Sequence, residues 1–183
     1  QTMLASSKDP DMASNALSYK QEDGLIFLNQ VPKSNQTIES NLTFPIDLSL
    51  ENGVLFIPST MENKWAIYFH QNKLIFVRSW LREVLVVAET IQENNQLRVK
   101  KISGTFTDNE SEQFTESVLN FLMHSHALNS IVPAPIPKEY KNNPDQAGWW
   151  AFSVYGNLAH YGYFEDLITY STESKLRSHS LLH

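Results

Sequence analysis

The chain contains no cysteine and only six glycines among its 183 residues. The absence of cysteine excludes disulfides, thiolate catalysis, zinc–cysteine sites and iron–sulfur clusters. With so few glycines, the chain also lacks the glycine-rich phosphate loops, dinucleotide-binding fingerprints and nucleophile elbows that need this residue at set spacings. We therefore expect no cofactor.

Basic residues are also few and are not clustered. The chain carries 14 Lys and Arg against 20 Asp and Glu, a formal net charge of −6. A nucleic-acid surface needs clustered cations that displace counterions, and the one basic stretch, Arg98–Lys101, fits the solvent side of a strand. The same acidic charge disfavours an anionic membrane surface. We therefore expect no nucleic acid as a partner.

Long apolar runs are missing too. The chain is 42% apolar and 19% charged, which is typical of one globular domain. We expect a single domain over residues 1–183, with residues 1–22 and 171–183 peripheral or poorly ordered. No membrane span is predicted, because the most apolar region, residues 65–91, is interrupted by polar side chains: His70, Lys73, Arg78, Arg82 and Glu83.

The first residues give little information on the compartment. The chain begins at Gln1 rather than methionine, and no basic segment followed by an apolar run comes after it. We expect a cytoplasmic protein, while a removed signal peptide, a longer parent chain and the oligomeric state all stay open.

The N-terminal third predicts at most one short helix, around Asp11–Tyr19, followed by short strand-like runs. A polar loop is expected at Pro32–Ser40. Pro45 should lie at a sheet edge or a bend, because proline cannot donate to a central ladder. The strand-like runs are Leu25–Leu28, Leu42–Leu50 and Val54–Ile57.

Residues 64–107 predict an antiparallel meander of four strands, because only short turns separate the apolar runs. The runs are Trp65–His70, Leu74–Ser79, Val84–Ile91 and Leu97–Phe106. Both faces of these strands are apolar. The sheet should therefore be covered on both sides or curled on itself.

The last of these strands changes its pattern midway. Leu97 and Val99 point to one face, but Ile102 and Gly104 have the opposite parity. Side chains alternate between the two faces of a strand, so all of these residues can face the core only if one extra residue interrupts the alternation. We therefore predict a β-bulge near Lys100–Lys101.

A helix is predicted at Ser111–Ala127, where apolar residues recur at helical spacing. Capping-box spacing occurs at Thr107 with Glu110 and at Asn109 with Glu112. The proline-alternating segment 131–137 should then run extended across a surface.

The aromatic region 144–164 is compatible with either a helix or a hairpin. Asn143-Pro144 is a specific helix start, so we favour a C-terminal aromatic helical segment. The fold class that follows is α+β: a strongly bent, mainly antiparallel sheet of about six or seven strands, packed by helices. Seven strands followed by one helix is similar to the element order of pleckstrin-homology-like barrels, an analogy that no sequence motif supports.

Arg78, Trp80 and Arg82 are the first candidate site. Arg78 extends an apolar face with a guanidinium, which must find a carboxylate, a carbonyl or a ligand anion. An anion or partner contact with Trp80 as a stacking surface is one interpretation. An internal ion pair to Glu83 or Glu89 is the favoured one.

The C-terminal aromatic residues are the second candidate. Trp149, Tyr161 and Tyr163, together with Trp150 and Tyr155, would suit a partner-binding surface, since Trp and Tyr dominate interface hot spots. Packing at a helix–sheet junction is the commoner role of such residues, and we favour it.

Histidines form the third candidate. His124 and His126 would point about 160° apart on a helix, so we predict no shared metal ion. His160 lies near the acidic Glu165 and Asp166, which suits acid–base chemistry only if a substrate proton lies within reach.

Two functional hypotheses follow. The first is a non-catalytic binding or interaction domain whose partner is a protein with a basic surface. The alternative is a small hydrolase or lyase that uses His124 or His160 with an acidic residue in a cleft. We favour the first, and a cavity where a histidine meets a carboxylate would favour the second.

Overall fold

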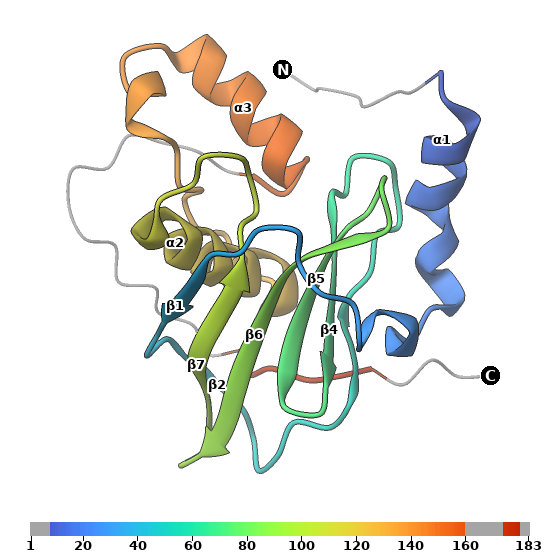
Figure 1. Ribbon diagram of the computed structural model, residues 1–183, viewed down its shortest axis with the longest axis vertical. Helices are drawn as coiled ribbons and strands as arrows, with labels where there is room; N and C mark the ends of the chain where they lie inside the picture. The colour runs from blue at the N-terminus through green and yellow to red at the C-terminus, as the bar shows by residue number, and fades with distance from the viewer. Residues whose placement is uncertain (1–7, 160–173, 180–183) are drawn as a thin grey trace.

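A computed structural model, which describes residues 8–159 and 174–179, confirms the α+β class (Figure 1). Its described part contains a seven-stranded antiparallel sheet in the order β1-β7-β6-β5-β4-β3, with β2 also pairing with β7. The strands are β1 Thr37–Glu39, β2 Thr43–Pro45, β3 Gly53–Phe56, β4 Trp65–His70, β5 Lys73–Arg78, β6 Glu83–Glu93 and β7 Gln96–Gly104. The α-helices are α1 Pro10–Leu17, α2 Glu112–Leu122 and α3 Pro144–Tyr155.

The predicted meander is confirmed over β4 to β7. Each strand pairs antiparallel with the next. The turns Gln71-Asn72 and Asn94-Asn95 both have two consecutive positive φ angles, between 50° and 57°. Such a pair matches the right-handed twist of the strands it joins, and asparagine tolerates it better than most residues.

The predicted β-bulge is also confirmed. Glu89 of β6 pairs with Lys101, but the next residue, Thr90, pairs with Val99. Lys100 is therefore the extra residue, and both Val99 and Ile102 remain buried. On the outer side of β7, β1 and β2 pair on either side of this bulge. The bulge thus divides one edge of the sheet into two short strands.

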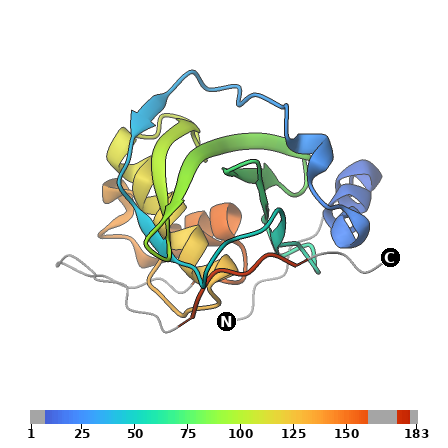
Figure 2. The ribbon, with the colours of Figure 1, turned by 90° about the horizontal axis from the view of Figure 1, so that it is seen from below.

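Apolar side chains on both faces of the sheet are covered, as predicted. One face joins α2 in the main core, to which Trp65, Phe76 and Phe121 belong. The opposite face forms a smaller cluster in which Tyr68 packs with Tyr19 and Phe27 of the N-terminal segment. Figure 2 shows the bent sheet from one end, with the N-terminal helix on the opposite side from α2 and α3. The sheet does not close into a barrel.

Four local predictions were wrong. The run Leu42–Leu50 forms a strand only at Thr43–Pro45, and the N-cap of α2 is Ser111 rather than Thr107 or Asn109. Leu25–Leu28 is not a strand, because Leu25–Phe27 forms a 3-10 helix whose start is stabilised by the Asp23 carboxylate accepting from the Leu25 amide at 3.0 Å. The polar segment Pro32–Ser40 is not all loop, since it contains β1. β1 has three residues, of which only Ile38 is buried.

The predicted helices are confirmed within the described residues. The Ser111 hydroxyl accepts from the Phe114 amide at 3.2 Å and begins α2, which continues into a π-helical turn at Met123–Ala127. At α3, the Asn143 side chain accepts from the Gln146 amide at 3.1 Å, so this part is not a hairpin. Across residues 8–159 and 174–179, no helix has both the length and the apolar character to cross a membrane.

Candidate functional site

A cleft of about 850 Å³ lies between the N-terminus of α2, the proline-rich segment and α3. Its walls are formed by the polar loop before α2, by the apolar stretch Pro135–Pro137, and by the aromatic rings of Phe114, Tyr140 and Trp150. The lining residues are Thr107, Asp108, Asn109, Glu110, Ser111, Gln113, Phe114, Ser117, Pro135, Ile136, Pro137, Lys138, Glu139, Tyr140 and Trp150.

The loop before α2 is held in place by the Glu110 carboxylate. It accepts hydrogen bonds from the amides of Phe106 at 3.0 Å and Thr107 at 2.9 Å. The hydroxyls of Thr107 and Thr115 donate to it at 2.8 and 2.6 Å. Four donors to one carboxylate give this wall of the cleft a defined shape, since charge-assisted hydrogen bonds are the strong ones.

Trp150 forms the aromatic floor with two rings from other elements. Phe114 of α2 lies 5.8 Å from the Trp150 ring and Tyr140 lies 6.4 Å from it, centroid to centroid. The proline-rich segment is attached to the same helix, because the Tyr155 hydroxyl donates to the Pro135 carbonyl at 2.8 Å. The floor is therefore assembled from segments separated by tens of residues.

The rim of the cleft is acidic. Asp108, Glu110 and Glu139 line it, against one cation, Lys138. Glu110 is engaged internally, while Asp108 and Glu139 are exposed. Low-polarity walls beside like charges concentrate the local field, so the rim favours cationic groups in the cleft.

Arg78 stabilises the C-terminal end of α3. Its guanidinium donates to the Val154 carbonyl at 2.9 Å and to the Ser153 carbonyl at 2.6 Å. Trp65 donates its indole N–H to the same Val154 oxygen at 2.7 Å. The last carbonyls of a helix lack intrahelical partners, and a cation there also complements the helix dipole. Burial lowers the pKa of Arg78 to about 10.

Trp80 lies in a small aromatic cluster around a lysine. Its indole N–H donates to the Met61 carbonyl at 2.9 Å, and the Lys64 ammonium lies 4.0 Å from the centre of its ring. Lys64 is only 5% exposed and also faces Phe152. Burial, with a smaller contribution from Arg78, lowers the pKa of Lys64 to about 8. Lys64 was not among the expected site residues, although its position directly before the apolar run Trp65–Phe69 was the available signal.

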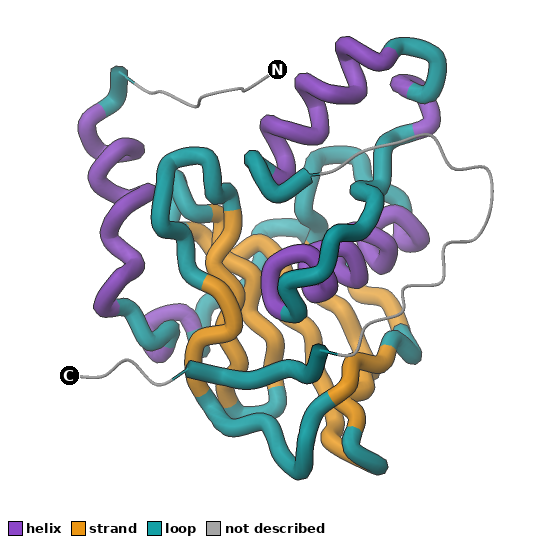
Figure 3. Tube along the Cα trace, turned by 180° about the vertical axis from the view of Figure 1, so that it is seen from behind, coloured by secondary structure: helices purple, strands orange, loops and turns teal. Residues whose placement is uncertain are grey.

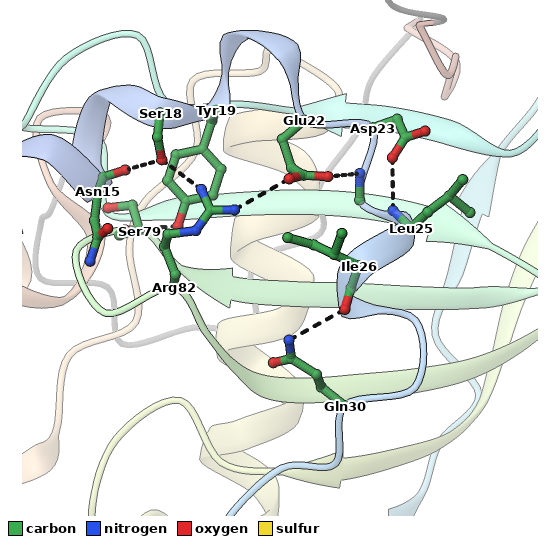
Figure 4. A network of polar contacts seen from close by, with 11 residues as sticks. Asn15, Ser18, Tyr19, Glu22, Asp23, Leu25, Ile26, Gln30, Ser79 and Arg82 are labelled. Atoms are coloured by element: carbon green, nitrogen blue, oxygen red, sulfur yellow. Dashed lines mark hydrogen bonds and ion pairs between the residues drawn. The ribbon is translucent and has the colours of Figure 1, made fainter.

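Arg82 faces the N-terminal segment rather than Arg78 or Trp80. Figure 4 shows its guanidinium donating to the Ser18 hydroxyl at 2.6 Å and to the Glu22 carboxylate at 3.2 Å. The guanidinium also lies 4.8 Å from the Tyr19 ring centre. Arg82 thus forms an internal ion pair with Glu22. The ion pair expected for Arg78 is not observed among the described residues, because Arg78 donates to backbone carbonyls while Glu83 pairs with Lys33 and Glu89 with Lys101. Arg78, Trp80 and Arg82 thus make separate sets of contacts.

The aromatic candidates are only partly described. Trp149 is 66% exposed on α3, next to the cleft-lining Trp150. Tyr161 and Tyr163 lie outside the described residues, as do His160, Glu165 and Asp166. Tyr140 and Phe114 complete the aromatic floor, and sequence analysis did not connect them with Trp150.

The two helical histidines are buried among different aromatic rings. The ring of His124 lies 5.7 Å from that of Phe44, and the ring of His126 lies 4.8 Å from that of Phe56. Burial lowers the pKa of both imidazoles, that of His126 to about 3. The cleft is lined by no histidine, and in the described part of the chain no three His, Cys, Asp or Glu side chains gather as metal ligands.

No family model, no curated protein and no solved structure matches this chain.

Proposed function

We propose that the protein is a non-catalytic binding domain, and that its cleft between α2 and α3 takes an aromatic or apolar side chain from a partner that carries basic residues. The observation that supports this most is the combination of an aromatic floor around Trp150 with an acidic rim. Aromatic rings supply most of the binding energy in protein interfaces, and charges at the rim select the partner.

The chemistry of the lining residues fits recognition better than catalysis. Glu110 is occupied by four internal donors, so it serves the loop. Asp108 and Glu139 are exposed, so both carboxylates are accessible to cationic groups of a partner. The Trp150 ring is half-buried, so one part is anchored and another part is available to a ligand.

The test uses two short synthetic peptides, each with one tryptophan, flanked either by two arginines or by two glutamates. We expect the arginine peptide to bind at least tenfold more tightly in calorimetry, a difference of about 1.4 kcal/mol. The preference should weaken as salt is added, because the rim charges are exposed. Equal affinities of the two peptides would contradict the proposal.

Variants locate the site. Asp108→Asn with Glu139→Gln should remove most of the preference for arginine while leaving folding intact. Glu51→Gln is the matched control, because Glu51 is an exposed carboxylate outside the cleft lining. Loss of the preference in the control instead would place binding elsewhere.

A further inference from the structure

Residues 174–179 lie between the two edges of the open sheet. Leu176 bridges Ile46, just beyond β2, in parallel orientation, and His179 bridges Val54 of β3 in antiparallel orientation. The Leu176 amide donates to the Pro45 carbonyl at 2.8 Å. Val54 and His179 exchange amide-to-carbonyl hydrogen bonds of 3.2 and 2.8 Å. Figure 3 shows this segment crossing the strands near the C-terminus. We call the gap that it fills, between Pro45–Asp47 and Gly53–Val54, the edge slot.

The edge slot recognises the segment through one apolar side chain and the backbone. Leu176 is only 2% exposed and belongs to the main core, whereas both of its neighbours are exposed. Gly53 has a φ of 150°, and a Cβ atom there would lie 3.0 Å from the His179 carbonyl oxygen. The glycine therefore permits the close backbone approach that an added strand needs.

The edge slot also selects charge. The Asp47 carboxylate lies 2.9 Å from the Lys175 ammonium and 3.5 Å from the Arg177 guanidinium. The hydrogen bond and the charge of Lys175 lower the pKa of Asp47, with Arg177 contributing less. One carboxylate thus faces the two cations that flank the buried leucine.

We propose that the edge slot is a recognition site for an extended partner segment with a basic–apolar–basic pattern, and that residues 174–179 occupy it as an intramolecular competitor. Strand addition to a sheet edge uses main-chain hydrogen bonds for affinity and alternate side-chain pockets for specificity. None of these contacts requires that the inserted segment belong to the same chain. The edge slot and the cleft share no residue, so the proposal for one site can be wrong while the proposal for the other holds.

The absence of cysteine makes a direct test available. Val54→Cys with His179→Cys introduces the only two thiols in the chain, at positions paired across the edge slot. Cα atoms of bridged strand residues lie within the span of a disulfide. Oxidation should therefore lock the chain's own segment in place.

The probe is a fluorescently labelled synthetic peptide with the sequence of residues 174–179, titrated into the full chain and followed by anisotropy. We expect the reduced double variant to bind it at least tenfold more tightly than the oxidised form. Leu176→Asp, which weakens the competitor, should bind more tightly than the wild type. If that variant fails to fold, the comparison of reduced and oxidised forms decides alone.

Charge provides the second arm. A peptide with glutamate at both basic positions should bind at least tenfold more weakly, and Asp47→Lys should reverse this preference. Asp145→Lys, at an exposed carboxylate of α3, is the matched control and should change nothing. The proposal would be overturned if the labelled peptide bound the reduced and oxidised double variants equally well, or if it bound neither of them. An intermolecular disulfide would overturn it as well, since the occupant would then be a second copy of this chain.

Discussion

His126 should make the folded state sensitive to mild acid. Its ring is packed against Phe56 and Phe121, and within residues 8–159 and 174–179 its one hydrogen bond joins Nδ1 to the Ser125 hydroxyl. Burial lowers its pKa from 6.5 to about 3. Below pH 6.5 the imidazole of His126 is therefore protonated in the unfolded chain, whereas in the folded chain it stays neutral until the pH approaches 3.

The sign and size follow from this difference. Because the folded pKa is depressed, the stabilisation is complete above pH 6.5 and is lost as the pH falls toward 3. Between pH 8 and pH 5 the loss is about 2 kcal/mol, since each pH unit below 6.5 costs about 1.4 kcal/mol. Stopping at pH 5 keeps most carboxylates ionised. His124, whose pKa is also lowered by burial, acts in the same direction.

The assay is urea unfolding at pH 8 and pH 5 for the wild type and His126→Leu. Leucine keeps the site apolar but does not titrate, so the variant should lose about 2 kcal/mol less than the wild type over this range. The cost of leaving the Ser125 hydroxyl unpaired is the same at both pH values and cancels in the comparison. An identical pH dependence in the two proteins would refute the reasoning.

Three further predictions follow from other contacts. Lys64→Met should remove a gain in stability that the wild type shows between pH 8 and 10, because a lowered lysine pKa means that the folded chain releases its proton first. The gain is about 1–2 kcal/mol after allowance for screening, measured by urea unfolding. Arg78→Met should cost about 2–4 kcal/mol by loss of two charged hydrogen bonds to α3, and amide exchange should rise at the end of that helix first. Deleting Lys100 alone should keep Ile102 inward and preserve cooperative thermal unfolding, because it removes only the extra residue of the bulge, whereas deleting both Lys100 and Lys101 should turn Ile102 outward and abolish cooperative unfolding.

The part of the fold that sequence analysis predicted rests on local patterns. The parity change between Val99 and Ile102 was enough to place the bulge, because only one extra residue reconciles two buried sets on one strand. The start of α3 was also predictable from a local pattern, because Asn143 is a helix-capping residue and Pro144 fits the first helical position. Strand β1 was missed because its formation depends on β7, more than sixty residues later in the chain.

The sites depended more on tertiary contacts. Arg78 was expected to pair with Glu83 or Glu89, but it donates instead to the Ser153 and Val154 carbonyls, more than seventy residues later. Arg82 likewise pairs with Glu22, sixty residues earlier, which the N-terminal segment brings close. The aromatic floor has the same character, since Tyr140 reaches Trp150 only after the proline-rich segment has crossed the surface. The spacing of residues along the sequence does not predict contacts of this kind between distant segments.

The four tryptophans test the binding proposal most directly. Trp65 and Trp80 donate their indole N–H groups to internal carbonyls, and Trp150 lines the cleft. In ¹H–¹⁵N spectra, titration with the tryptophan peptide flanked by arginines should move the Trp150 indole signal and leave those of Trp65 and Trp80 in place. A stationary Trp150 signal at concentrations where the peptide binds would contradict the account.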